Sequence, residues 1–297
     1  MPSVYEEFLA FRKGLPRTPR LERQTIRARG ISFAVFSSPP VGMAPPLICV
    51  NGGMLYDHSM LWPALSPLAA RRQLILYDQR GRGNSSAPPV PLDASIEDDA
   101  GDVGALRRAL GVRRYDLLGH SWGGGIAMLA AAEDGAAVRR LVLVDPVWST
   151  SAWMGPLRRN VIKRLDSTGR EAVERIPESA LGNPDPALHN AYSQVVYPAW
   201  FTDAEMARRF APPAAASPTG AAILARLRRD GYDWRPKLGA LSTSALVIQG
   251  DADPLPLADS AETSYIGKNA HVVVVPSGHM PFWEAPQRFF SLVESFL

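Results

Sequence analysis

The chain has 297 residues, of which 46% are hydrophobic and 21% charged, a balance that allows a large buried core and excludes wholesale disorder. Its single cysteine, Cys49, excludes an intrachain disulfide framework and a cysteine-based zinc cluster, and no apolar run approaches the ~20 residues that span a bilayer. The net charge of +3 comes with arginine pairs scattered along the chain rather than in one stripe, so no nucleic-acid partner is expected.

Short apolar runs predict the strands of a sheet. Most of them are continuous rather than alternating, which is typical of strands buried on both faces. Residues 95–110 and 123–132 lie between such runs and have the composition of helices that pack on a sheet. The pattern predicts an α/β fold with a mostly parallel, doubly wound sheet. In chain order, the predicted strands are residues 31–36, 47–50, 74–77, 115–118, 141–144, 245–248 and 272–275.

Asn51-Gly52-Gly53-Met54 follows the second predicted strand and is a candidate oxyanion loop. Glycines at this place let a backbone N–H point toward a developing oxyanion, and one such donor is worth roughly 3–4 kcal/mol. We assign the Met54 N–H to this role, with the Gly53 N–H as the alternative. A plain β-turn without a catalytic role is the alternative.

Gly119-His120-Ser121-Trp122-Gly123 matches the pattern Gly-x-Ser-x-Gly, which chance alone produces in about one chain of this size in ten. Here it lies directly between a predicted strand and a predicted helix, as in a nucleophile elbow. The turn is too sharp for side chains at the flanking positions, so glycine is needed there. We therefore predict Ser121 as the nucleophile and the Trp122 N–H as the second oxyanion donor. A glycine-rich turn with a capping serine is the alternative.

Residues 148–236 interrupt the alternation of strands and helices. The segment has helix-like pieces, proline clusters and no clear buried strand, and a structureless loop of that length would be unusual. We expect a helical cap here, with residues 1–147 and 237–297 forming the core; an irregular stretch of core is the alternative. Trp148, Trp153 and Trp200 are candidates for lining a substrate pocket, although they could equally serve to pack the cap.

A serine hydroxyl is a poor nucleophile until a base removes its proton. His279 follows the last predicted strand. This position agrees with the chain order of serine, acid and histidine that accompanies a nucleophile elbow of this kind. The acid is expected after the strand at 245–248, where Asp251 and Asp253 compete. We favour Asp253, which precedes a proline that fixes the turn, and assign Asp251 to the turn itself. The acid would hold the His279 tautomer and stabilise the imidazolium formed during attack.

Together with the segment 77–85, these motifs resemble the α/β-hydrolase superfamily, and most closely its proline iminopeptidase-like branch. The resemblance covers about residues 20–147 and 240–297. It implies an α/β-hydrolase fold with a helical cap inserted after the sixth strand, and a structural rather than catalytic role for Asp78 and Arg80. Where the branch usually has His-Gly-Gly-Pro-Gly, this chain has Asn51-Gly52-Gly53-Met54-Leu55.

We therefore predict a serine hydrolase with a Ser121-Asp253-His279 triad that acts on a small hydrophobic ester or lactone. A proline iminopeptidase-like aminopeptidase is the alternative, and it would need a cap carboxylate to bind the substrate amine. A non-hydrolytic lyase or a ligand-binding member of the superfamily is a third possibility. The cap acids available for amine binding are Glu171, Glu174, Glu178, Asp185, Asp203 and Glu205.

Other expectations concern cofactors, partners and location. No metal-binding spacing of histidines and carboxylates and no phosphate loop appears, so neither a metal nor a cofactor is expected. The partner is a small-molecule substrate, with no membrane partner, and the sequence does not give the oligomeric state. The first residues lack the basic and apolar regions of a signal peptide, so a cytoplasmic protein is expected.

Overall fold

A single twisted sheet organises the molecule. The computed structural model describes residues 2–177, 180, 185–210, 213, 215–239, 241–258, 260–266 and 270–297. Within these residues, an 8-stranded sheet has the order β1-β2-β4-β3-β5-β6-β7-β8, in which β2 pairs antiparallel with β1 and β4 and the other pairs are parallel. The predicted doubly wound, mostly parallel sheet is confirmed. The strands are β1 (Glu22–Ala28), β2 (Ile31–Ser37), β3 (Leu47–Val50), β4 (Leu74–Tyr77), β5 (Tyr115–His120), β6 (Val138–Val144), β7 (Ala245–Gly250) and β8 (Ala270–Val275).

The burial of the predicted strands differs across the sheet. The central strands β3, β4, β5 and β7 are buried along their whole length, and each contains one of the predicted apolar runs. The edge strand β8 also contains such a run, 272–275, but only Val275 of it is buried. The edge strand β1 is mostly exposed and has the polar sequence ERQTIRA, so hydrophobicity alone does not identify it. Its pairing with β2 across Arg29 and Gly30, both at positive φ, forms a hairpin.

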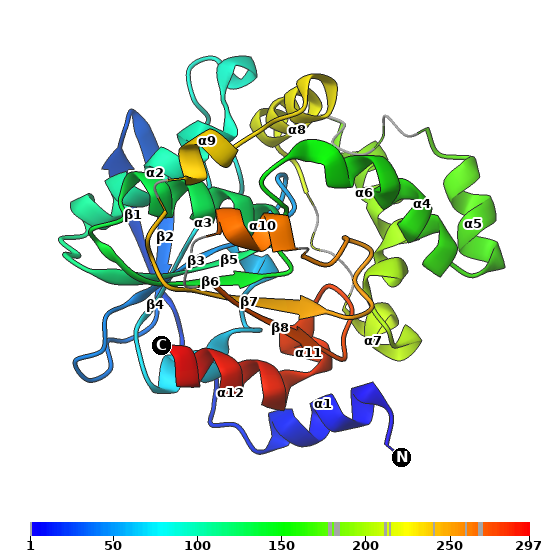
Figure 1. Ribbon diagram of the computed structural model, residues 1–297, viewed down its shortest axis with the longest axis horizontal. Coiled ribbons are helices and arrows are strands. Elements are labelled where there is room, and N and C mark those ends of the chain that lie inside the picture. The colour runs from blue at the N-terminus through cyan, green and yellow to red at the C-terminus, as the bar shows by residue number, and fades with distance from the viewer. Residues whose placement is uncertain are drawn as a thin grey trace.

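Helices cover both faces of the sheet (Figure 1). On one side lie α2 (Ile96–Ala109), α3 (Trp122–Glu133), α9 (Arg235–Leu238) and α10 (Ser260–Tyr265). On the other side lie α1 (Val4–Lys13), α11 (Pro281–Glu284) and α12 (Pro286–Phe296). Neighbouring strand residues point to opposite faces, so Leu117 joins the apolar cluster under α3 while Leu118 joins the cluster under α12.

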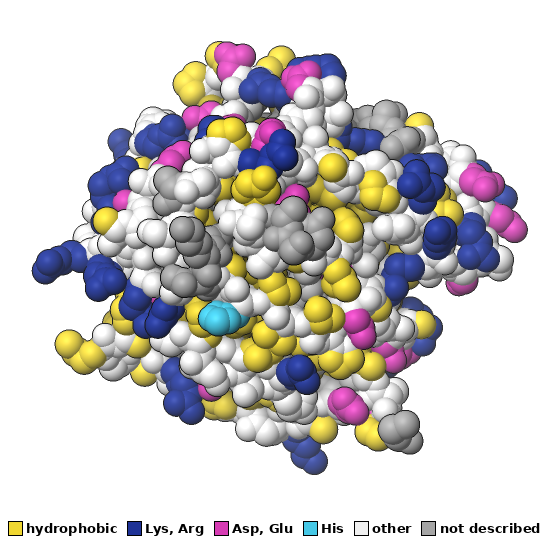
Figure 2. Space-filling view, viewed as in Figure 1, with side chains coloured by type: hydrophobic (Ala, Val, Ile, Leu, Met, Phe, Trp, Pro, Cys, Tyr) yellow, Lys and Arg dark blue, Asp and Glu magenta, His cyan; other side chains and the backbone are white. Residues whose placement is uncertain are grey.

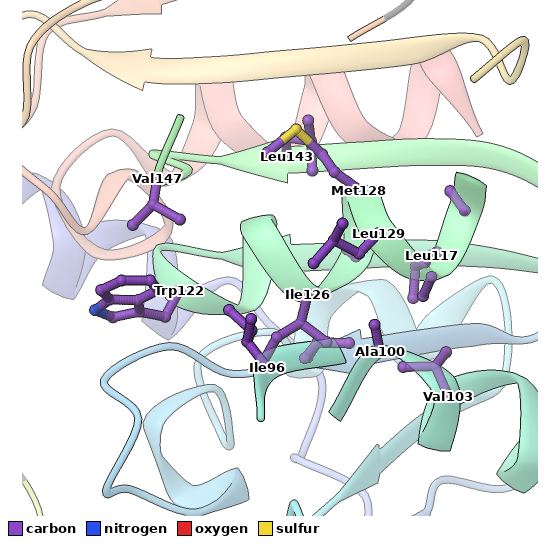
Figure 3. Close-up of a cluster of buried hydrophobic side chains, with 14 of the residues drawn as sticks. Ile96, Ala100, Val103, Leu117, Trp122, Ile126, Met128, Leu129, Leu143 and Val147 are labelled. Atoms are coloured by element: carbon purple, nitrogen blue, oxygen red, sulfur yellow. The ribbon is translucent and has the colours of Figure 1, made fainter. Parts of the chain in front are cut away.

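Figure 3 shows the packing of α3, the helix that begins at the predicted elbow. Ile126 points toward Ile96 of α2. The α3 residues Ile126, Met128 and Leu129 belong to one buried cluster, which also contains Leu143 of β6. This helix is buried over nearly its full length, so its position relative to the sheet is tightly fixed.

The described parts of residues 148–236 are largely helical. In Figure 1 the helices α4 to α7 lie beyond the end of the sheet toward which β6 and β7 point, and α4, α5 and α6 enclose a small apolar cluster of their own. The carboxyl ends of the parallel strands therefore face these helices. They are α4 (Met154–Arg164), α5 (Ser167–Glu174), α6 (Pro186–Val196), α7 (Ala204–Arg209) and α8 (Pro218–Asp230), with short 3-10 turns at Ser151–Trp153 and Tyr197–Trp200.

The surface carries charges of both signs. On the face shown in Figure 2, Lys and Arg side chains are scattered around the outline with Asp and Glu among them, and apolar side chains lie between. Among the helices in the described ranges, none combines the length and the apolarity that a membrane crossing requires.

Candidate active site

Ser121 lies in the sharp turn between β5 and α3. Its φ of 55° and ψ of −121° fall in a strained region that costs a non-glycine residue about 1–3 kcal/mol. The backbone holds this turn: the Ser121 N–H donates to the Val144 carbonyl oxygen (2.9 Å), and the Ser121 carbonyl oxygen accepts from the Gly124 N–H (2.9 Å). A Cβ atom at Gly119 would collide with the Gly123 carbonyl, so the chain can make this elbow only with glycine there.

His279 pairs with Asp253. His279 follows β8, and Asp253 follows β7. The distance from His279 Nδ1 to Asp253 Oδ2 is 2.7 Å, and the two side chains are 5% and 0% exposed, respectively. The other carboxylate oxygen of Asp253 accepts a hydrogen bond from the Leu255 N–H (2.9 Å). The competing acid, Asp251, is exposed, and its backbone N–H donates to Val275. Asp253 is thus the aspartate that faces the histidine.

Burial lowers the pKa of His279 below its ordinary value, so the imidazole is neutral at neutral pH. Because a carboxylate only accepts hydrogen bonds, the contact with Asp253 assigns the remaining ring proton to Nδ1. The lone pair is then on Nε2, which is the atom that a general base uses to take a proton from serine.

His120 holds the loop that carries His279, a role that sequence reasoning missed. Its Nε2–H donates to the His279 carbonyl oxygen (2.9 Å), and the two rings lie 4.7 Å apart between centroids. Burial lowers the pKa of His120 to about 3, so its ring is neutral. The residue lies inside the Gly-x-Ser-x-Gly motif, but no spacing in the sequence indicates a partner 159 positions away.

The helical segment also contacts the histidine loop. The His279 N–H donates to the Trp200 carbonyl oxygen (2.8 Å), and the Trp200 and His279 rings lie 4.6 Å apart. The buried Glu284 carboxylate accepts from the Gly278 N–H and from the Thr202 N–H, each at 2.7 Å. The residues after α6 are therefore tied directly to the loop that positions the imidazole.

Ser121 and His279 open onto one cavity with a volume of about 190 Å³. No hydrogen bond joins the Ser121 hydroxyl to the imidazole, although both residues lie in the described part of the chain. Such bonds are often long in an unliganded site and tighten when the substrate binds. Most of the lining is apolar or aromatic. The segment 148–236 supplies much of it, including Trp153, Leu157, Val161, Tyr192, Val196 and Leu224.

Two of the three predicted pocket tryptophans line this cavity. They are Trp153, whose indole N–H donates to the Tyr232 hydroxyl (2.6 Å), and Trp200. The third, Trp148, is buried in the core under α3, and its indole N–H donates to the Pro256 carbonyl oxygen (2.9 Å). Trp148 is not among the residues that line the cavity.

The predicted oxyanion loop lies against the elbow. An ideal Cβ at Gly52 would come within 2.6 Å of Ser121 Cβ, and Gly53 and Met54 have φ of 76° and 42°. Arg82 fixes the loop, because its Nε–H donates to the Met54 carbonyl oxygen (2.7 Å). Among the residues described, neither the Met54 N–H nor the Trp122 N–H donates to another protein group. Both amides are thus available to an oxyanion, and Trp122 lies at the positive end of α3.

Asp78 and Arg80 make the structural contacts expected of them. Asp78 accepts from His58 (2.7 Å to Nδ1) and from the Asn84 N–H (2.8 Å), while Arg80 makes two hydrogen bonds to Asp102 at 2.6 and 2.7 Å. Asp78, Arg80 and Asp102 are buried, His58 is half-buried, and Asn84 is exposed; none of them lines the cavity.

Two clusters in the described residues have the donor types of a metal site. One is Asp57, His58 and Asp78, and the other is Asp145, Asp253 and His279; in each, three ligand atoms lie within 4.8 Å of one another. In both clusters the imidazole Nδ1 already faces a carboxylate oxygen at 2.7 Å, so that atom is engaged without an ion. The arrangement in both is that of a hydrogen-bonded His–Asp pair.

Comparison with known proteins gives one family. A family model described as the alpha/beta hydrolase fold matches residues 45–286. A proline iminopeptidase of Heyndrickxia coagulans is 26% identical, with the match covering 90% of this chain and 94% of that protein. Among solved structures, an enol-lactonase from Burkholderia xenovorans LB400 is similar with a TM-score of 0.66 at 22% identity, covering 92% of this chain and 99% of that one. A proline iminopeptidase from Mycobacterium smegmatis has a TM-score of 0.67 at 21% identity, covering 93% and 97%.

Proposed function

Because the chain belongs to the α/β-hydrolase family, and resembles its proline iminopeptidase-like branch, we propose that it is a serine hydrolase that forms an acyl-enzyme on Ser121. One observation carries this proposal: a strained serine at the head of α3 shares a cavity with a neutral, buried histidine that is 2.7 Å from a buried aspartate. These are the parts that serine-based acyl transfer requires.

The reaction proceeds in two halves. His279 Nε2 takes the proton as Ser121 Oγ attacks the substrate carbonyl, and Asp253 stabilises the imidazolium that forms. The Met54 and Trp122 N–H groups stabilise the oxyanion, with the Gly53 N–H as the alternative to Met54. His279 then protonates the leaving group. Water then attacks the acyl-enzyme while His279 takes its proton, and His279 returns that proton to Ser121 Oγ as the bond to the acyl group breaks.

The cavity supports a small hydrophobic ester or lactone as substrate. Its lining is rich in aromatic and aliphatic side chains, which favour binding of an apolar acyl or alcohol group. The proline iminopeptidase similarity supports the second candidate, an aminopeptidase. That reaction needs an acid beside the substrate amine. Of the six cap acids considered, Glu178 lies outside the described residues, and the other five are absent from the lining (Glu171, Glu174, Asp185, Asp203 and Glu205).

We propose that residues 148–236 act as the cap of this site. Helices α4, α6 and α8 contribute side chains to the cavity, opposite the elbow and the histidine loop. The cap would set which acyl and alcohol groups fit, while the strand ends carry out the chemistry.

The test is substitution of Ser121 by alanine with short activated esters and proline-naphthylamide as the two substrates. We expect the wild-type protein to hydrolyse the ester faster, and Ser121→Ala to lower kcat by at least about 10³-fold while the circular dichroism spectrum is retained. Undiminished ester turnover in Ser121→Ala would overturn the assignment. Faster turnover of the naphthylamide would establish the aminopeptidase instead.

A further inference from the structure

A second aspartate lies beside the His279–Asp253 pair, and the mechanism above does not use it. Asp145 follows β6 directly and is completely buried. Its backbone N–H donates to the Ile248 carbonyl oxygen (2.9 Å), and its Oδ1 accepts from the Gly250 N–H (2.8 Å). Both contacts are to β7, so Asp145 is fixed at the carboxyl ends of two neighbouring strands.

The other carboxyl oxygen of Asp145 has an unusual environment. Oδ2 is buried, and no hydrogen-bond donor among the described residues reaches it. The Asp253 carboxyl group lies close to the Asp145 carboxyl group, since one ligand atom each of Asp145, Asp253 and His279 are all within 4.8 Å of one another. Two carboxylates that face each other in a buried place must be explained, because each can only accept hydrogen bonds when ionised.

Electrostatics require a proton between them. Two negative charges about 4 Å apart repel by about 4 kcal/mol at an effective dielectric constant near 20, in addition to the cost of burying each charge. A single proton shared by the pair turns this repulsion into a charge-assisted hydrogen bond. The unpartnered Oδ2 of Asp145 then becomes a donor with an acceptor in place.

The contacts also indicate which carboxyl keeps the proton. Asp253 already accepts from the Leu255 N–H and from His279 Nδ1–H, which stabilise its charge. Among the groups that the structure describes, the Asp145 carboxyl accepts only from the Gly250 N–H. Burial and the neighbouring Asp253 raise the pKa of Asp145 well above its ordinary value. Burial also raises the pKa of Asp253, but the hydrogen bond from Asp145 opposes that rise.

We propose that Asp145 is a positioning residue of this site, which stays un-ionised at neutral pH and donates a hydrogen bond from Oδ2 to the Asp253 carboxylate. The donated bond fixes the orientation of the carboxylate that faces His279, and it limits the charge beside the imidazole to one. Its kinetic consequence rests on the proposed function of Ser121 and His279. The charged and titratable groups around the pair are His279, Arg164 of α4 and Glu284 of α11, with His120 beyond His279.

The experiment compares Asp145→Asn with Asp145→Gly. Asparagine keeps the shape, accepts from the Gly250 N–H through its carbonyl oxygen and always donates through its amide, so it imitates an un-ionised aspartic acid. Both replacements suit the backbone, because Asp145 has a φ of 42°, a region open to asparagine and glycine. Glycine removes the donor without adding strain.

We expect Asp145→Gly to lower kcat on an activated ester by about tenfold with little change in KM, because Asp253 loses one charge-assisted hydrogen bond. The pKa of Asp253 then rises, so the acid limb of kcat/KM moves to higher pH by about half a unit or more. Asp145→Asn should restore kcat to within about threefold of wild type and return the acid limb to its wild-type position.

Three kinetic results would overturn the proposal. The first is a loss in Asp145→Asn as large as that in Asp145→Gly, and the second is an acid limb that moves to lower pH in Asp145→Asn; both would mean that Asp145 is ionised in the wild-type protein. The third is an unchanged kcat and pH profile in Asp145→Gly, with only a lower Tm, which would make the residue merely structural.

An infrared measurement tests the proton without any substrate. The difference spectrum of wild type minus Asp145→Asn at neutral pH should contain the carbonyl band of an un-ionised carboxyl group. Its absence would overturn the proposal even if the hydrolase assignment holds, and its presence would support it even if the ester is not the substrate. This measurement also decides the question if Asp145→Gly does not fold.

Discussion

The two walls of the cavity are built in different ways. The core wall carries Ser121 after β5 and His279 after β8, with Asp253 paired to His279 beneath the surface of the cavity, and main-chain hydrogen bonds fix each of the three. The opposite wall is formed by side chains of residues 148–236, such as Trp153, Val161 and Tyr192, of which the last two belong to a separate small apolar cluster. The difference separates two tasks: chemistry needs atoms held within fractions of an ångström, whereas binding of an apolar group needs shape and area.

The largest expected effect comes from replacing Asp253, the acid that pairs with His279. Asp253→Asn should lower kcat by about 10⁴-fold, because an amide donates to His279 Nδ1 and forces the wrong tautomer. Steady-state kinetics on an activated ester measure it. The matched control is Asp251→Asn, which changes an exposed aspartate two positions earlier and should leave kcat within twofold, about 0.4 kcal/mol. Equal losses in both variants would contradict the choice of Asp253.

A second change tests how the core wall is supported. Arg82 and Asp99 form an ion pair with both side chains 0% exposed, and Arg82 also holds the Met54 carbonyl. Arg82→Met should lower the free energy of unfolding by about 3–5 kcal/mol, because it leaves Asp99 buried without its counter-charge. Urea unfolding measures this. Arg229→Met, which removes the exposed partner of Asp230, should leave the urea midpoint unchanged; a similar loss in both would show that the buried pair is not special.

The pH dependence tests the neutral imidazole. Because burial lowers the pKa of His279 below 6.5, kcat/KM should be constant around neutral pH and should fall only as the pH drops through a value clearly below 6.5. The rate falls at low pH because protonation of His279 occupies the lone pair on Nε2, which the proposed general base needs. A profile of kcat/KM against pH from about 4 to 8 measures it. An acid limb above pH 6.5 would contradict the buried, neutral base.

The smallest effect belongs to the helical wall. Trp153→Phe should raise KM for a bulky aryl ester by about threefold to tenfold and leave kcat for a short acyl ester within about twofold, because only the shape of the cavity changes. Trp148→Phe is the matched control, since each variant loses one indole hydrogen bond but only Trp153 lines the cavity. The same shift in substrate preference for both variants would mean that Trp148 and Trp153 act through stability alone.

The same comparison explains what could be predicted from the sequence. The core wall was predictable because buried parallel strands appear as continuous apolar runs and the residues at their carboxyl ends meet at one edge of the sheet. Ser121, Asp253 and His279 were predicted as site residues on this basis; the fold class is confirmed, and the catalytic roles of the three residues stay predictions. Strand β1 was not predictable, because its side chains are exposed and its pairing with β2 gives no apolar signal.

The helical wall was less predictable, since the faces of short amphipathic helices do not reveal what they face. Trp148 and Trp153 lie five positions apart in similar surroundings of the sequence, and both belong to the main buried cluster, yet only Trp153 lines the cavity. The contacts of His120 and Asp145 were missed for another reason. Each depends on a partner that is distant in the sequence, and that partner becomes visible only when β5, β6, β7 and β8 are placed side by side.

The most direct measurement is covalent labelling with a fluorophosphonate, followed by peptide mass spectrometry. The account predicts one adduct, on Ser121, that is absent from Ser121→Ala and forms much more slowly in His279→Ala, because phosphonylation requires the same activated hydroxyl as acylation. A folded wild-type protein that stays unmodified, or that carries its adduct on another residue, would contradict the account and would favour a binding or non-hydrolytic member of the family.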